Sequence, residues 1–358
     1  ASDVYKRQVE LRKKLAGKAA SVNPYIEELY EGLNGSSRPQ DLETLFQLIY
    51  LYMTEPRRDP QAYRAYQERL REAVKNRQDS PDAVFADRVR TLLAQNHFRA
   101  RPWSLELIQE MDLDNSLSIY RDRFRDAGDF TFIFVGSFTP EQLEPFVVRY
   151  LASLPSSGRV EFWRDTGVRP PQGVVRAQVR KGLEPRSRVV LIFSGQTEWS
   201  LRRSLEVQVL AEVLDIRLRE TVRDQAGGSY DISAAGQLNR YPQPDYYVSV
   251  GFGCAPDQVD RLSELVLAQV EKLRGQGPSA EELAKVKEIL RRDRERSLQD
   301  NVYWLESLQT VYSNGLEPRV LLDYESWLAS IDIHALRATA AALLRPDNYL
   351  RVDLLPQQ

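Results

Sequence analysis

The stretch LRETVRDQAGGSY, residues 218–230, ends the longest helical pattern in the chain and begins an extended one. Apolar residues recur at helical spacing before it and predict a helix from about residue 199 to residue 223. Two adjacent glycines, Gly227 and Gly228, then stop the helix and let the backbone turn sharply. A strand is expected over residues 228–236. The stretch therefore predicts a helix that folds back into a strand.

Arg223 and Tyr230 stand on the two sides of this turn. An arginine offers a forked cation and a tyrosine offers a phenolic O–H donor. Together they could hold a developing oxyanion, a role worth about 3–4 kcal/mol for one such donor. In a purely structural interpretation, the arginine meets the dipole at the helix C-terminus and the tyrosine fills a strand face. Spacing alone favours the structural interpretation.

The remaining patterns alternate between helices and strands. Before the helix, we expect helices that begin near Asp41, Pro60 and Ser80, a helix through Leu117 that stops at Gly128, a buried strand over 130–136, a helix over 139–154, and strands over 174–179 and 189–193. After it, we expect a strand over 246–252, four or five helices, and a last strand over 349–355. These patterns predict an α+β fold.

An internal echo suggests a duplicated unit. Met111-Asp112-Leu113 precedes a helix and then the strand at Phe130, while Ile331-Asp332-Ile333 precedes a helix and then the strand at Tyr349. The offsets, 331 − 111 = 220 and 349 − 130 = 219, agree closely. Helix–turn–strand ends can also look alike by chance, which is the alternative to duplication.

Composition excludes several classes of function. The chain has 49 Lys and Arg against 51 Asp and Glu, a formal net charge of −2. That balance argues against a broad nucleic-acid-binding surface and against a polybasic membrane anchor. No run of about 18 apolar residues predicts a membrane span. The single cysteine, Cys254, cannot close a disulfide within the chain and is expected to be an inert apolar residue.

The common catalytic motifs are missing from the sequence. The two histidines, His97 and His334, have no ligand partner at helical spacing and are expected to be structural. No phosphate loop, nucleophile elbow or CxxC pair occurs. We therefore predict no metal site and no cofactor bound by this chain.

The arginine, six intervening residues and tyrosine after a long helix also match a family pattern. On these residues the chain resembles the C-terminal half of an M16 (pitrilysin/insulinase-like) zinc metallopeptidase, of the bacterial type with four domains on one chain. Other motifs carry the same resemblance: Gly128-Asp129-Phe130-Thr131-Phe132, Arg240-Tyr241-Pro242, Gly277-Pro278-Ser279, Asn301-Val302-Tyr303-Trp304-Leu305 and Pro346-Asp347-Asn348-Tyr349.

The resemblance implies α/β-roll domains, each an antiparallel-rich sheet covered by helices, that close as two pairs around an unfolded peptide. It implies a lead over residues 1–16, a partial third domain over 17–158 that is truncated at its N-terminus, a linker over 159–173 and a C-terminal domain over 174–358. It also implies that Tyr230 donates to the tetrahedral oxyanion and that Arg223 holds the substrate carbonyl. Gly227, Gly228 and Ser229 would contact the substrate.

The chain departs from the family pattern because it has no H-x-x-E-H motif, which binds zinc in the N-terminal half. Either the chain is a fragment whose catalytic half lies upstream, or it is a natural non-catalytic subunit that serves as a binding or structural partner. Its N-terminus, which looks like a cloning junction and has no signal-peptide core, favours the fragment. In both cases we expect zinc on the N-terminal half or partner chain, and no peptidase activity from this chain alone.

A third hypothesis concerns the tyrosines of the early helices, Tyr50, Tyr52, Tyr63 and Tyr66, which could line an independent peptide-binding groove. Aromatic residues at helical spacing more often belong to a core. The sequence leaves open the substrate, the oligomeric state and the compartment, for which family analogy suggests the bacterial periplasm.

Overall fold

The computed structural model describes residues 15–226 and 231–357, and for residues 223–226 it describes the backbone alone. The chain divides into two compact units. The first unit comprises the described residues up to Ala73 together with Ser104–Arg164, and the second comprises Val74–Trp103 and the described residues from Asp165 onward. The units are defined by contacts, so the domain boundaries expected from the family stay a prediction.

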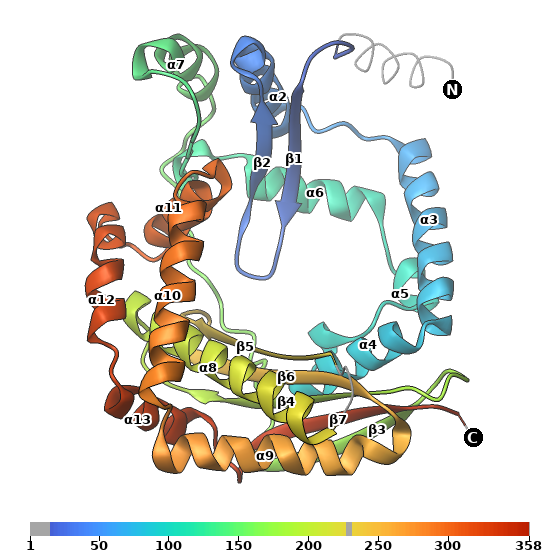
Figure 1. The fold of residues 1–358 in the computed structure, drawn as a ribbon. Helices are drawn as coiled ribbons and strands as arrows, with labels where there is room; N and C mark the ends of the chain where they lie inside the picture. Colours follow the sequence, from blue (N-terminus) through green and yellow to red (C-terminus); the bar gives the residue numbers. More distant parts are fainter. Residues whose placement is uncertain (1–14, 227–230, 358) are drawn as a thin grey trace. The chain divides into compact units, whose positions relative to one another are not determined.

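The first unit pairs one β-hairpin with helices (Figure 1). Strands β1 (Ala20–Ile26) and β2 (Glu31–Ser37) are antiparallel, with Ala20 opposite Ser37. The helices are α2 (Leu42–Thr54), the first part of α3 (Pro60–Asp79), α5 (Leu105–Gln109), α6 (Leu113–Phe124) and α7 (Pro140–Phe146), which continues as a π-helical turn over Val147–Leu151. One core holds the unit together, formed by Val22, Leu45, Leu48, Ile49, Met53, Phe124 and Leu154.

The strand predicted over residues 130–136 is wrong, because the structure has no strand there. Phe130 is extended, with φ −101° and ψ 140°, but the residues that follow pair with no strand in the described part of the chain. Phe130, Phe132 and Phe134 nevertheless pack on the core of the first unit. The apolar residues of this segment thus correctly indicated side chains that pack on a core. A strand also needs a neighbouring strand whose backbone groups pair with its own.

The second unit is built on a five-stranded sheet (Figure 1). Its strands are β3 (Val174–Arg180), β4 (Ser187–Gln196), β5 (Ile232–Asn239), β6 (Asp245–Cys254) and β7 (Tyr349–Leu355). The order is β3-β7-β4-β6-β5, so β5 lies at an edge with β6 as its neighbour. Only the β3–β7 pair is parallel among these strands, and the other pairs are antiparallel.

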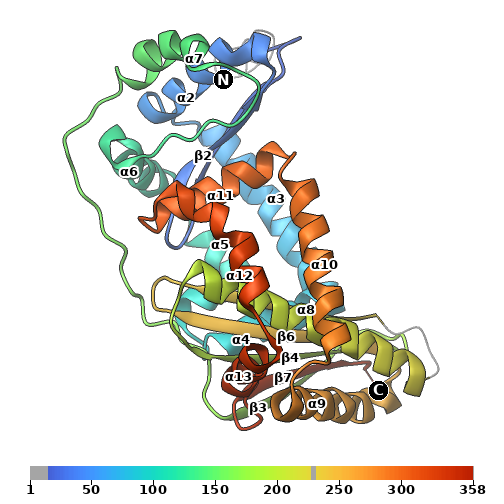
Figure 2. The same cartoon turned by 60° about the vertical axis from the view of Figure 1, so that its left-hand side comes forward.

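Helices cover both faces of this sheet, and the strand period of two explains how. On β4, Val189, Leu191 and Phe193 belong to a large core shared with the helices of one face. Figure 2 shows α9 and α13 on the same side of the sheet. The helices that contribute to this core are α8 (Leu201–Ala226), α9 (Val259–Gln276), α10 (Ala280–Ser297), α12 (Tyr324–Ser330) and α13 (Ile333–Leu343). Helix α11 (Asn301–Ser313) contacts the 3-10 helix Pro318–Asp323 instead.

The opposite face of the sheet is covered by α4 (Pro81–Leu93). Phe85 of α4 packs with Ile192 of β4 and with alternate residues of β7, such as Val352. Because β4 is apolar on both faces, it reads as a continuous apolar run over residues 189–193. Strand β7 is buried too, but it alternates apolar residues with the ion pair of Arg351 and Asp353. The α+β class with an antiparallel-rich sheet covered by helices is therefore confirmed.

Candidate functional site

The residues on which the sequence hypothesis rests lie at the end of helix α8 and between α8 and strand β5 (Ile232–Asn239) in the sequence. The predicted helix over 199–223 is confirmed as α8, Leu201–Ala226, and places Arg223 in its last turn. The side chain of Arg223 is outside the described part, and so are Gly227, Gly228, Ser229 and Tyr230. The convergence of Arg223 and Tyr230 therefore stays a prediction. The structure describes helix α8 before these residues and strand β5 after them.

Asp215 ties the start of β5 to α8. This buried carboxylate accepts a hydrogen bond from the backbone N–H of Ala234 at 2.9 Å and pairs with Arg219 at 2.8 Å. Strand and helix also approach closely at Gly236, where an added Cβ would lie 2.8 Å from the carbonyl oxygen of Val207. Glycine is required at this position because a side chain would collide with helix backbone. These contacts fix the two ends between which residues 227–230 run.

Arg217 anchors the C-terminal half of α8 to the turn before α10. Its guanidinium donates to both carboxylate oxygens of Glu282 at 2.7 Å and to the carbonyl oxygen of Gly277 at 3.3 Å. Glu282 also accepts from the backbone N–H of Ser279, whose hydroxyl accepts from the N–H of Glu282, forming a capping box. Burial alone would raise the pKa of Glu282, but the hydrogen bonds from Arg217 and Ser279 outweigh it and lower the pKa.

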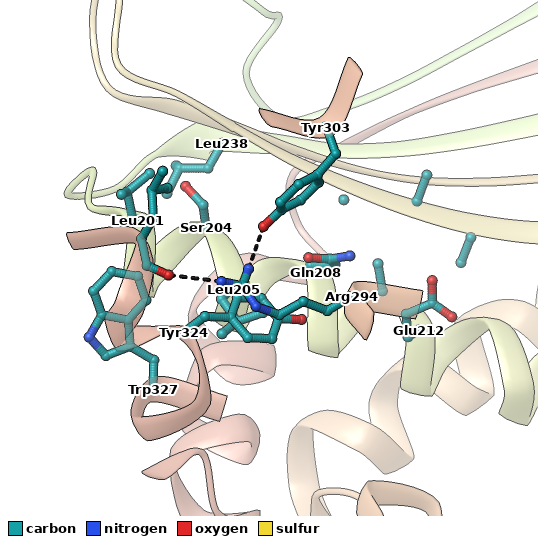
Figure 3. A pocket seen from close by; sticks show the side chains of 15 residues that line it. Leu201, Ser204, Leu205, Gln208, Glu212, Leu238, Arg294, Tyr303, Tyr324 and Trp327 are labelled. Carbon is teal, nitrogen blue, oxygen red and sulfur yellow. Dashed lines mark hydrogen bonds between the residues drawn. The ribbon is translucent and has the colours of Figure 1, made fainter. Parts of the chain in front are cut away.

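Next to α8 and β5, the second unit contains a cavity of about 520 Å³ (Figure 3). Its walls come from one face of α8, from β5, and from α10, α11 and α12. Aromatic and aliphatic side chains form much of the wall, among them Leu201, Leu205, Leu238, Tyr324 and Trp327. Two charged side chains, Glu212 and Arg294, also line it.

The guanidinium of Arg294 is held in place by neutral groups of the protein. Its guanidinium donates to the hydroxyl of Tyr303 and, at 2.8 Å, to the carbonyl oxygen of Leu321. It also lies 4.2 Å from the ring centroid of Tyr324, in cation–π geometry. Figure 3 shows the side chain held between these groups. Arg294 thus acts as a rigid part of the cavity wall.

Glu212 is in a different situation. This half-buried carboxylate lines the cavity and forms no hydrogen bond or ion pair with the residues described in the structure. Burial raises its pKa first, and the negative charges of Asp215 and Asp293 raise it further, while Arg219 acts in the opposite direction. The cavity therefore has one carboxylate without a positive partner among the described side chains.

The other groups singled out in the sequence do not join this site. His97 accepts from the backbone N–H of Arg99 at 3.3 Å and stacks near Phe98. Cys254 is buried, and burial raises the pKa of its thiol to about 11, so it is a poor nucleophile. No group of three or more His, Cys, Asp or Glu within the described ranges could hold a metal ion. No helix of the described chain is long and apolar enough to cross a membrane.

The four tyrosines of the third hypothesis make different contacts. Tyr50 packs on the core of the first unit and edge-on against Tyr150. Tyr52 is partly exposed, and its carbonyl oxygen accepts from the hydroxyl of Tyr120 at 2.9 Å. Tyr66 is exposed, and the buried hydroxyl of Tyr63 has no partner in the described structure. The contacts of Tyr50 support a core role for that residue, and a groove at the four tyrosines stays a prediction.

A comparison with known protein families identifies the family to which the chain belongs. Residues 111–290, about half of the chain, match the model of the peptidase M16 inactive domain. That range contains the whole of α8, β5 and β6, and the residues between α8 and β5. The chain belongs to the peptidase M16 family.

Individual relatives add detail. A protein of Arabidopsis thaliana named zinc protease PQQL-like is 26% identical over 344 residues, which cover 89% of this chain and 36% of that protein. The crystal structure of the periplasmic protease PqqL from Escherichia coli has a TM-score of 0.81 at 21% identity, covering 97% of this chain and 38% of that one. The chain therefore spans little more than a third of these relatives.

A second solved structure is closer to this chain in length. The peptidase M16 inactive domain from Pseudomonas fluorescens has a TM-score of 0.77 at 14% identity, and the match covers 95% of this chain and 81% of that one. At such low identity the likeness shows the fold alone. The resemblance predicted from sequence motifs is confirmed at the level of the family and the fold.

Proposed function

We propose that this chain is the non-zinc-binding C-terminal half of an M16-like metalloendopeptidase, that it closes the chamber around a peptide, and that it supplies Arg223 and Tyr230 to the scissile carbonyl. The observation that carries the proposal is the match to the inactive-domain model over residues 111–290, since that range includes both Arg223 and Tyr230. The N-terminal H-x-x-E-H half is the proposed partner, on the same full-length chain or as a separate subunit.

The proposed roles follow from the chemistry of the two side chains. The phenol of Tyr230 donates a hydrogen bond to the oxygen that becomes negative in the tetrahedral intermediate. The guanidinium of Arg223 holds the carbonyl or backbone of the peptide beside it. Gly227, Gly228 and Ser229 form the turn that lets the two side chains meet at the substrate. The ties at Asp215 and Arg217 support this arrangement because they fix α8 and β5 against each other and against α10.

Zinc chemistry belongs to the other half in this proposal. In the family, the metal activates the attacking water. The residues described in the structure offer no group of three or more suitable ligands, so they do not fit a zinc site. No step on this chain is therefore derived through the metal. Purified alone, the chain is expected to cleave no peptide.

The decisive experiment is Tyr230→Phe in the full-length protease that contains the H-x-x-E-H half. Loss of the hydroxyl should lower kcat by about 100- to 1000-fold with little change in KM, because the hydrogen bond is made in the transition state. Tyr312→Phe, at an exposed position on α11, is the matched control and should keep wild-type kcat. Unchanged turnover in Tyr230→Phe would remove this residue from catalysis.

A second candidate function is a natural non-catalytic subunit that serves as a binding or structural partner. The absence of a metal-holding group within the described residues is compatible with it. The genomic sequence upstream separates the two. An in-frame H-x-x-E-H supports the proteolytic half, whereas a start codon immediately upstream without a neighbouring peptidase gene supports the subunit.

A further inference from the structure

The cavity beside α8 has the features of a side-chain-binding pocket, and none of its described lining residues takes part in the proposed Arg223–Tyr230 chemistry. We propose that it binds the lysine or arginine side chain of an extended polypeptide, with Glu212 as the partner of the cationic head. The argument rests on three observations: the nature of the wall, the balance of charge, and the neighbouring strand edge.

The wall fits the stem of a long basic side chain. Leu205, Tyr324 and Trp327 present apolar and aromatic surface, and the cavity of about 520 Å³ is large enough for one extended side chain and part of its backbone. Lysine and arginine carry an apolar stem and a charged head, so they pack along such a wall and still reach a polar group at its end. Figure 3 shows Glu212 on α8, beyond Gln208, toward one side of the cavity.

The charge balance selects a cation. Arg294 is held in place by three neutral groups, from Tyr303, Leu321 and Tyr324, and forms no ion pair with Glu212 among the described contacts. Glu212 has no positive partner among the described side chains, and Asp215 and Asp293 add negative potential to it. An apolar ligand would cover the carboxylate without pairing it, which is costly. A guanidinium or ammonium group would pair it and recover the cost of its burial.

The outer edge of strand β5 favours a polypeptide as the ligand. Strand β5 lines the cavity and has β6 as its neighbour in the described sheet. Ala234 points its N–H away from β6 toward Asp215, so Gly236 and Leu238 point theirs the same way by the period of two. Neither residue has a backbone partner on that outer side in the described structure. An extended peptide can therefore pair with β5 while one of its side chains enters the cavity.

The test is direct binding of blocked pentapeptides to this chain, measured by isothermal titration calorimetry. One peptide carries a single arginine in an alanine background, and its counterpart carries citrulline, which keeps the shape and removes the charge. We expect the arginine peptide to bind about tenfold tighter, as for one charge-assisted hydrogen-bonded pair. Glu212→Gln should reduce the ratio to about one. Glu264→Gln, at an exposed position on α9, should leave it near ten.

Each other outcome overturns a part of the inference. Equal affinity for the two peptides, or no binding of either at millimolar concentration, removes the basic pocket. A preserved tenfold ratio in Glu212→Gln removes Glu212 as the partner, provided that circular dichroism shows a native fold. Binding of acetyl-arginine amide as tight as that of the pentapeptide removes the strand edge from the argument.

The inference deepens the proposed function, because it takes the ligand to be a polypeptide. Its failure is nevertheless distinguishable, since the titration involves no turnover. Tyr230→Phe is expected to keep the tenfold ratio while it lowers kcat in the full-length protease. If the wild-type chain shows no preference for the arginine peptide while Tyr230→Phe lowers kcat as expected, the basic pocket is rejected and the proposed function stands. If the tenfold ratio is found but Tyr230→Phe keeps the wild-type kcat, the role of Tyr230 is rejected and the basic pocket stands.

Discussion

Two segments with similar sequence patterns adopt different structures in this protein. Strand β6 alternates buried residues such as Val248 and Val250 with less buried ones, and it is paired on both sides, by β4 and by β5. The segment over residues 130–135 carries a phenylalanine at every second position within a nearly continuous apolar run, but it has no strand neighbour in the described chain and its phenylalanines are only half-buried. The difference lies in the surroundings of the two segments, because their own residues suit a strand equally well.

This comparison teaches that apolar alternation and strand pairing are separate properties. Alternation determines which side chains seek a core, and Phe130, Phe132 and Phe134 do reach one. Pairing depends on whether another strand arrives at the correct distance with matching hydrogen-bonding groups. Three pairs of substitutions test how far the two units differ.

The largest difference is expected from proline in each segment. Val250→Pro removes a backbone donor from a strand paired on both sides and should destabilise the second unit by about 3 kcal/mol or more. Thr131→Pro should change the stability of the first unit by less than about 1 kcal/mol, because Thr131 is exposed and no backbone carbonyl of the described chain accepts from it. Hydrogen exchange with mass spectrometry reports each unit separately. Comparable damage from both prolines would show that the 130–135 segment is paired in solution.

An intermediate difference is expected from two ion pairs. Arg217→Met breaks a largely buried bidentate pair and should cost about 2 kcal/mol, whereas Arg58→Met, which breaks the exposed pair with Asp114, should change stability little. The two values are to be compared by urea unfolding at pH 7.

The cost of Arg217→Met should also depend on pH. The folded pKa of Glu282 is below its ordinary value of 4.5, so its stabilising effect is complete above that value and is lost as the pH falls through the lower folded pKa. The gap between wild type and Arg217→Met should therefore narrow below about pH 4. A gap that stays constant down to pH 3 would contradict the assignment to Glu282.

The smallest difference is expected from the helix caps. Thr139 begins α7 in the first unit and Ser279 begins α10 in the second, each with a complete capping box. Thr139→Ala and Ser279→Ala should each cost about 1 kcal/mol, because a cap acts within one turn whatever surrounds it. Amide exchange in the first turn of each helix should speed up by about fivefold. A much larger effect in one unit would mean that its cap also supports tertiary contacts.

Much of the fold could be predicted because local chemistry specifies it. The long apolar stripe before residue 223 predicted α8, and Thr139-Pro140 predicted the start of α7. The family pattern from Arg223 to Tyr230 indicated the correct family. The sequence did not single out Asp215 or Glu212, because each gains its importance from partners or neighbours in distant elements.

The amino-acid sequence by itself determined where helices begin, which faces are apolar and which family motifs are present, since these depend on neighbours within a few residues. Tertiary structure alone decided that α4 packs on the far face of the second sheet, that the segment 130–135 has no strand neighbour in the described chain, and that Glu212 lines a cavity. The physical reason is that pairing, burial and electrostatic surroundings are set by groups distant in the chain, whose arrival no local pattern records.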